Sequence, residues 1–257
     1  MFFLTAVGRV FLIFMAHTGR FSLFAMTAII HVFLPPWYWR QLLRQLLHMG
    51  YFSLPVVGLT AIFSGMVLAL QSYTGFSRFD AEGAIATVVV LSMTRELGPV
   101  LAGLMVAGRI GAATAAEIGT MRVTDQIDAL RTLSTHPFKY LVVPRLIAGV
   151  TMLPLLVLIA DIIGVFGGYL VSVYKLGFNP ANYIHQTIKY LEPEDVTSGL
   201  IKASFFGFII ALMGCYQGYY SSRGAEGVGR ATTNAVVASS ILILVSNYIL
   251  TALLFSK

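Results

Sequence analysis

The sequence predicts an all-helical integral membrane protein with five transmembrane helices, an N-terminal amphipathic helix at the membrane interface, and a short cytoplasmic helix between two of the spans. Ala, Val, Ile, Leu, Met, Phe, Trp, Tyr and Cys make up 57% of the 257 residues, and charged residues only 11%. Soluble domains average about 45–50% apolar and about 25% charged residues. So few charges cannot cover a soluble surface, and a single cysteine excludes a disulfide scaffold.

Five apolar segments are long enough to cross a bilayer, which takes about 20 helical residues. The predicted spans are residues 51–73, 83–108, 146–174, 203–220 and 236–255. The second is interrupted only by Arg95 and Glu96, and the third contains Asp161. We therefore divide the chain into an N-terminal interfacial arm, residues 1–50, and a membrane domain, residues 51–257.

The N-terminal arm is expected to lie on the membrane rather than to cross it. Residues 21–34 are apolar but too short for a span, and Arg20 precedes them. In residues 37–49, apolar side chains follow a helical period on one face, and Arg, Gln and His occupy the other. This pattern is typical of a helix that lies in the interface. The alternative is a sixth span through residues 10–34.

Basic residues in the loops predict the orientation. The N-terminal arm and the loops 109–145 and 221–235 share one side in a five-span chain and hold eleven Lys and Arg residues, against five on the other side. This excess places the N-terminus in the cytoplasm and the C-terminus outside. The net charge of +6 includes no run of adjacent Lys and Arg, so nucleic acid is not an expected partner.

No enzyme signature occurs in the sequence. There is no H-E-x-x-H, no G-x-S-x-G and no Cys/His cluster, so we expect neither a catalytic residue nor a metal site. A G-x-x-x-x-G-K-[ST] phosphate loop is also missing. If the protein uses ATP, another chain binds it.

Arg95 and Glu96 are the most unusual charges, because the apolar stretches on either side are each too short to cross alone. Both residues therefore belong near the middle of the membrane, where such charges face a cavity or a partner. One interpretation is a lock between helices, for instance Arg95 with Asp161. The favoured one is a polar element at the edge of a substrate cavity. For Asp161, a hydrogen bond between helices is favoured over a proton relay.

The cytoplasmic loop after the second span shows helical patterns of its own. Small residues from Gly108 to Gly119 recur at a spacing that lets helices approach closely. Thr114 and Glu117 have the spacing of a capping box. A second amphipathic pattern begins at residues 124–125. Periodicity alone leaves open whether this short helix docks a soluble partner or packs on its own chain.

Residues 106–130 read VAGRIGAATAAEIGTMRVTDQIDAL and closely resemble the signature of MlaE/YrbE-type permeases. These are the membrane subunits of ABC transporters that traffic phospholipids with an MCE-domain protein. The TRELGPV at 94–100 and the GRATT at 229–233 match two further motifs of the family. Residues 137–145 continue the match, and the resemblance runs from about Gln41 to the C-terminus.

The resemblance implies a homodimeric permease in the bacterial inner membrane, with phospholipid as substrate and maintenance of outer-membrane lipid asymmetry as its role. It implies two cytoplasmic ATPases that hold ATP and Mg, no cofactor in this chain, and periplasmic MCE-domain partners. The rival hypotheses are a membrane-embedded lipid-modifying enzyme with Glu96 or Asp161 as base, and a structural anchor for an ATPase.

The resemblance also assigns residues to the two proposed sites. Arg95 and Glu96 would face the central cavity near the lipid headgroup. Leu68, Gln71 and Phe79 are added on physical grounds, because they lie at or next to the outer part of the first two spans and could supply apolar walls and polar groups for an amphiphile. The ATPase-coupling residues would be Glu117, Gly119, Arg122, Asp125, Asp128 and Arg131. The chain departs from the family at Asp125, where Glu is frequent, and at Arg131, where many members have Glu or Met.

Overall fold

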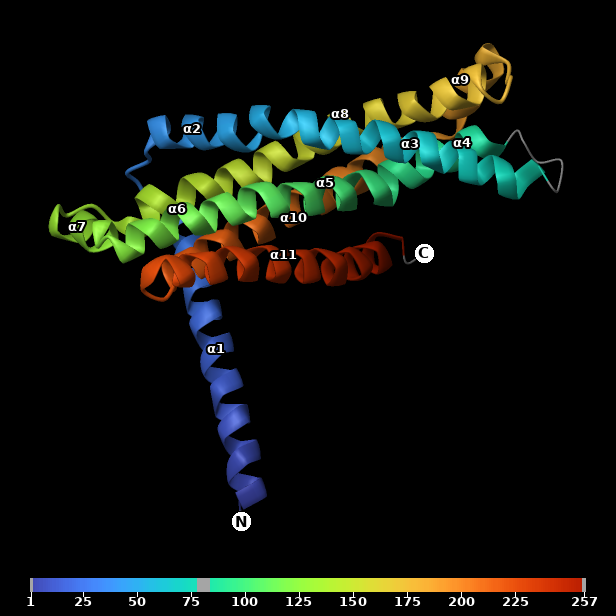
Figure 1. Cartoon of the computed structure of the whole chain (residues 1–257). Coiled ribbons are helices and arrows are strands. Elements are labelled where there is room, and N and C mark those ends of the chain that lie inside the picture. The colour runs from blue at the N-terminus through green and yellow to red at the C-terminus, as the bar shows by residue number, and fades with distance from the viewer. Residues whose placement is uncertain (1, 78–83, 256–257) are drawn as a thin grey trace.

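The computed structural model describes residues 2–77 and 84–255, and helices make up almost all of them (Figure 1). No strand occurs in these two ranges. Five helices among the described residues are long and apolar enough to cross a membrane. The predicted all-helical, five-span fold class is confirmed.

The helices follow one another with few breaks. They are α1 (Phe2–Val32), α2 (Trp39–Met49), α3 (Leu54–Phe76), α4 (Ile85–Ser92), α5 (Gly98–Val106), α6 (Ala112–Val123), α7 (Gln126–Thr132), α8 (Val143–Tyr174), α9 (Pro180–Tyr190), α10 (Pro193–Tyr219) and α11 (Gly224–Phe255). Two π-helical turns, Met93–Leu97 and Ala107–Gly111, join α4, α5 and α6 into one rod, which we call the α4–α6 rod.

The membrane-crossing helices are longer than the uncharged runs that predicted them. They comprise Trp39–Phe76, Ile85–Val123, Phe138–Tyr174, Pro193–Tyr219 and Gly224–Phe255. The largest difference is at the end of the second span, which continues to Val123 instead of ending at residue 108, and α10 begins at Pro193 instead of at residue 203. There the side chains of Glu192 and Asp195 form a capping box around the first turn, and Pro193 has its fixed φ at the first helical position.

The N-terminal arm contains two helices of different placement. Figure 1 shows α1 projecting steeply away from the bundle, with its C-terminal part against the other helices. In that part, Phe24 and Ala28 are buried. The amphipathic α2 runs on from α3 across a single 3₁₀ turn, Tyr51–Ser53, and packs on α8. Although α1 covers residues 10–32 of the 10–34 segment, it is not among the five candidate spans of the described chain. The interfacial position of the arm stays a prediction.

The two ends of the bundle hold different elements. In Figure 1, α7, the start of α2 and the connection between α10 and α11 gather at one end, while α9 and the C-terminal end of α11 lie at the other. The loops that the basic-residue count assigned to one side are therefore together at one end of the molecule.

Glycine pairs bring neighbouring helices into backbone contact. At Gly65 of α3, an added Cβ would lie 1.9 Å from the carbonyl oxygen of Gly164 in α8. At Gly207 of α10, it would lie 2.0 Å from the carbonyl oxygen of Gly149, also in α8. Small residues allow this approach, which stabilises helix pairs in a membrane through dispersion contacts. α8 is thus fixed on both sides by surfaces that have no room for a methyl group.

We expect Gly207→Ala to destabilise the protein by about 1–3 kcal/mol, because the methyl group forces α8 and α10 apart. The matched control is Gly75→Ala in α3, where an added Cβ would meet no atom within 4 Å. The midpoint of thermal unfolding in detergent is measured for both variants and for the wild type. The control should keep or slightly raise the midpoint, and equal midpoints for the two variants would contradict the close packing.

Candidate functional site

Arg95 and Glu96 lie in the π-helical turn Met93–Leu97, which joins α4 to α5 within the α4–α6 rod. In a regular helix the N–H of residue 99 would bond to the carbonyl of residue 95, but Pro99 has no N–H. The ammonium group of Lys202 donates to this Arg95 carbonyl instead, at 2.9 Å. A π turn next to proline is therefore stabilised by a side chain from α10.

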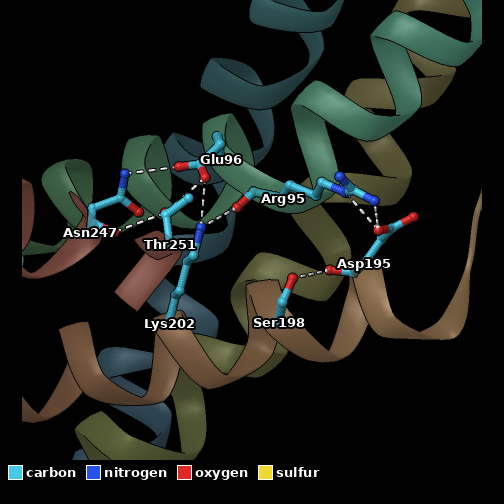
Figure 2. Close-up of polar contacts among 7 residues, drawn as sticks. All are labelled: Arg95, Glu96, Asp195, Ser198, Lys202, Asn247 and Thr251. Atoms are coloured by element: carbon cyan, nitrogen blue, oxygen red, sulfur yellow. Dashed lines mark hydrogen bonds and ion pairs between the residues drawn. The ribbon is translucent and has the colours of Figure 1, made fainter. Parts of the chain in front are cut away.

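The Glu96 carboxylate accepts three hydrogen bonds from two other helices (Figure 2). Lys202 Nζ donates at 2.7 Å and Thr251 Oγ1 at 2.9 Å, both to Oε1. Asn247 Nδ2 donates to Oε2 at 2.8 Å. The Lys202 side chain is 0% exposed, whereas the Glu96 side chain is 37% exposed. Glu96 is thus the counter-ion of a fully buried lysine and still reaches the surface of the chain.

Arg95 pairs with Asp195 at the start of α10. Arg95 Nε donates to Asp195 Oδ1 at 2.6 Å, and Nη2 lies 2.5 Å from the same oxygen. Asp195 is 1% exposed and Arg95 37%. The guanidinium also lies 4.8 Å from the centre of the Phe255 ring, within cation–π range. The bonds to Asp195 leave the Nη1 donors of this part-exposed group without a partner among the described residues.

Asp161, the example of a partner for Arg95 in the helix-lock interpretation, is the wrong acid, because Arg95 pairs with Asp195. Figure 2 shows Arg95 and Glu96 directed toward α10 and α11. Asp161 belongs to α8 and lies against Gly98 on another face of the rod. The four charges of Arg95, Glu96, Asp195 and Lys202 form two neutral pairs, which we call the charge network. The pairs join the rod to α10, as the helix-lock interpretation expects. Arg95 and Glu96 are also part-exposed, and their position at the edge of a substrate cavity stays a prediction.

The other predicted cavity residues are not joined to the charge network by a hydrogen bond in the described chain. Leu68 is part-buried and packs with Ala69, Val89 and Met93 in an apolar cluster. Gln71 is exposed on α3. Phe79 lies outside the described residues. Their part in a lipid cavity stays a prediction.

The proposed coupling residues fall into two groups at the α7 end of the bundle. On α6, Glu117 pairs with Arg145 of α8 at 2.7 Å, and the Arg145 side chain is only 4% exposed. The capping-box prediction for Glu117 is wrong, because Thr114 is buried within a continuous helix and no side chain caps α6. Tertiary packing extends the second span through the position where the local pattern indicated a helix start.

The second group surrounds α7, whose predicted start is confirmed. Arg122 Nη1 donates to both carboxylate oxygens of Asp128, at 3.2 and 3.1 Å. Arg131 lies 3.5 Å from Asp128 and donates to the Tyr219 hydroxyl at 2.6 Å. Asp125 begins the helix with a left-handed backbone, φ 56°. Gly119 packs beside the connection between α10 and α11, where an added Cβ would lie 3.3 Å from Ser221.

A polar cavity of about 580 Å³ opens beside these groups. Its charged and amide-bearing lining residues are Gln41, Arg44, Gln45, Glu117, Gln126 and Arg145. The cavity joins α2, α6 and α8, so a molecule that fills it contacts the N-terminal arm and the α4–α6 rod together.

Comparison with known sequences identifies the family. A family model described as Permease MlaE matches residues 42–253. The chain belongs to the MlaE permease family. A probable ABC transporter permease protein of Rickettsia bellii is 66% identical over 92% of each chain. A probable ABC transporter permease protein of Synechocystis is 44% identical over 84% of this chain and 82% of its own. The intermembrane phospholipid transport system permease protein MlaE of Haemophilus influenzae is 34% identical over 98% and 97%.

The resemblance inferred from residues 94–130 is therefore confirmed. As an MlaE-family permease with five long apolar helices, the protein is a multi-pass inner-membrane protein and a transport subunit rather than an enzyme. The charge network lies within the matched range, as does the coupling region around α7.

Sequence reasoning missed two residues of the charge network, Asp195 and Lys202, and the two residues that donate hydrogen bonds to it, Asn247 and Thr251. Two signals pointed to them. The acid–Pro–acid pattern at residues 192–195 is a helix-start signature that extends α10 back past Lys202. Asn247 and Thr251 are four residues apart in an apolar span and so share one helix face.

Proposed function

We propose that this chain is the membrane subunit of an ABC transporter that moves phospholipids between the inner membrane and a periplasmic MCE-domain partner, and so helps maintain outer-membrane lipid asymmetry. The observation that carries the proposal is the part-exposed charge network within a helical rod long enough to cross a membrane, in an MlaE-family chain. The name of the Haemophilus relative supports phospholipid as the substrate class.

The chemistry of the charge network suits an amphiphile. Arginine presents planar N–H donors that match a phosphate, and Arg95 keeps its Nη1 donors clear of Asp195. The acyl chains need apolar walls, which Leu68, Phe79 and the apolar part of Gln71 are proposed to supply. The network is neutral as a whole, so the phosphate competes with Asp195 for Arg95 and is held reversibly.

A second copy of the chain is proposed to close the cavity. One face of α11 carries large apolar side chains that nothing in the described chain covers: Val237, Ile241, Leu244, Val245 and Tyr248. Glu96 is bonded to Asn247 and Thr251 of the same helix. A homodimer formed through α11 would therefore place the two charge networks on either side of one interface.

The α4–α6 rod offers a mechanical route from ATP to the lipid. We propose that a cytoplasmic ATPase, which binds ATP and Mg, docks on α7 and in the polar cavity beside Glu117. Since the rod Ile85–Val123 is helical throughout, a displacement at the end of α6 moves the π turn that carries Arg95 and Glu96. ATP-driven closure of the ATPases would thus remodel the lipid site.

The orientation prediction follows from the loops gathered around α7. A reporter active only outside the cytoplasm should be active when fused after Lys257 and silent when inserted at His136. This reporter pattern is the one expected for an N-terminus in the cytoplasm and a C-terminus in the periplasm. The reverse pattern, or activity of both fusions, would contradict the five-span topology and favour a span through residues 10–34.

Purification from the native membrane tests the proposed function against its rivals. We expect an ATPase, an MCE-domain protein and phospholipid to co-purify with the chain, and added phospholipid to stimulate ATP hydrolysis. Lipid turnover by the chain alone would support the enzyme hypothesis. Co-purification of an ATPase without an MCE-domain protein, together with ATP hydrolysis that added lipid does not change, would support the hypothesis of a structural anchor for an ATPase.

A further inference from the structure

A second cavity, of about 570 Å³, lies between α8 and α9 on a different face of the α4–α6 rod from the charge network. The rod contributes Val90 and Thr94 to its lining. α8 lines it from Leu158 to Tyr169, which is about 16 Å at 1.5 Å per residue. The volume is that of a site for a small ligand. Ile162, Phe166 and Ile188 at its rim are exposed, so in a membrane it opens sideways to lipid.

Asp161 is the one charged residue in the described lining of this cavity. Its side chain is only 6% exposed, and Oδ1 is fully buried. Neither oxygen has a hydrogen-bond or ion-pair partner among the described residues, so the interhelical bond expected for Asp161 is not formed. A buried carboxyl group without a partner is costly in an apolar site and marks a functional position.

The surroundings of Asp161 favour a positively charged ligand. The described lining includes no Lys, Arg or His to compete for the carboxylate. It includes three aromatic rings, of which Phe166 and Tyr169 have centroids 6.4 Å apart, and Tyr169 and Tyr183 5.7 Å apart. Aromatic faces attract ammonium groups, and most strongly where water is excluded.

We propose that this cavity binds a single-chain amphiphile with an alkylammonium head. The head pairs with Asp161 and lies among the aromatic rings, and the alkyl chain fills the apolar length between α8 and α9. The ligand enters from the bilayer through the rim. This site is separate from the phospholipid path, because its charged group belongs to α8 and not to the charge network.

Equilibrium binding of radiolabelled dodecyltrimethylammonium to the purified protein in phosphatidylcholine nanodiscs tests the proposal, with partition into empty nanodiscs subtracted. This probe is charged at every pH. Dodecanol and laurate, which have the same chain length, are added as competitors for the same site. Dodecanol is the neutral competitor and laurate the anionic one. We expect each competitor to bind at least about tenfold more weakly than the cation, because only the cation offers Asp161 a counter-ion.

Asp161→Asn should weaken binding of the cation at least about tenfold, since the amide keeps the shape and loses the charge. Tyr169→Leu, which removes a ring and not the charge, should weaken it about threefold or more. Glu226→Gln, at an exposed acid in the first turn of α11 at the other end of the bundle, is the control and should bind normally. Similar affinities for cation, alcohol and acid would overturn the proposal, as would unchanged binding by monodisperse Asp161→Asn and Tyr169→Leu proteins.

Discussion

Glu96→Gln should lower the thermal stability of the protein sharply. The substitution leaves the ammonium group of Lys202, which is 0% exposed, without its counter-ion. Removing one member of a buried ion pair costs about 3–5 kcal/mol. We expect a loss toward the lower end of this range, because the Glu96 side chain is part-exposed and water can reach the Lys202 ammonium group from that side. The unfolding midpoint in detergent measures the loss.

A second substitution separates charge from shape. Lys202→Met in the Glu96→Gln background removes the stranded ammonium group and should recover most of the lost stability. Glu194→Gln, the same chemical change at an exposed position of α10, is the control and should leave the midpoint unchanged. Equal midpoints for Glu96→Gln and Glu194→Gln would show that the pair with Lys202 contributes nothing.

Glu117→Lys should have the second largest effect, through Arg145. The substitution places a second cation beside a guanidinium that is only 4% exposed. We expect destabilisation somewhat below the about 3–5 kcal/mol of a fully buried pair, since Glu117 is more than half exposed. Glu117→Lys also inverts a charge in the polar cavity, so association with the ATPase should be lost.

Asp128→Lys distinguishes docking from folding in this region. Asp128 is about half exposed and interacts with Arg122 and Arg131, which are also solvent-accessible. Its replacement should leave the unfolding midpoint nearly unchanged, because exposed pairs contribute about 0–1 kcal/mol. Capture of the ATPase by the tagged permease should fall nonetheless. Normal capture by both Asp128→Lys and Glu117→Lys would mean that α7 packs only on its own chain.

The sequence predicted what depends on local pattern and hydrophobic length. The five spans are such features, because an apolar run of sufficient length with few charges is most stable as a helix across the bilayer. The position of Arg95 and Glu96 inside a helix long enough to cross a membrane followed from the same argument. So did the start of α7, where polar and apolar residues alternate with a helical period.

Features that depend on contacts between distant segments were not predictable in the same way. Arg95 and Asp195 are 100 residues apart, and no local pattern indicates which acid completes the pair. Asp161 served as the example of a partner because it is the other acid within a predicted span, but the face of each helix decides which charges meet. Lys202 was assigned to a loop, because a criterion based on uncharged runs cannot include a buried lysine that has its own counter-ion.

The error at Glu117 has a different origin. Thr114 and Glu117 have capping-box spacing, but a capping box needs a chain that enters the helix there. The α4–α6 rod passes through this point without a break. Its surface of small residues packs closely on α10, where an added Cβ at Gly214 or Gly218 would lie about 3 Å from backbone or side-chain atoms of the rod. Packing between helices overrides the local signal.

The central claim is that Arg95 holds the headgroup of a transported phospholipid, and ATP-dependent lipid transfer tests it most directly. The assay follows a fluorescent phospholipid from proteoliposomes holding the whole complex to its MCE-domain partner. The decisive variant combines Arg95→Met with Asp195→Asn, which removes the guanidinium without leaving the buried acid unpaired. We predict that this complex assembles and hydrolyses ATP, but transfers lipid at least about tenfold more slowly, the loss expected for a charge-assisted contact. Transfer at the wild-type rate by the assembled variant would contradict the account.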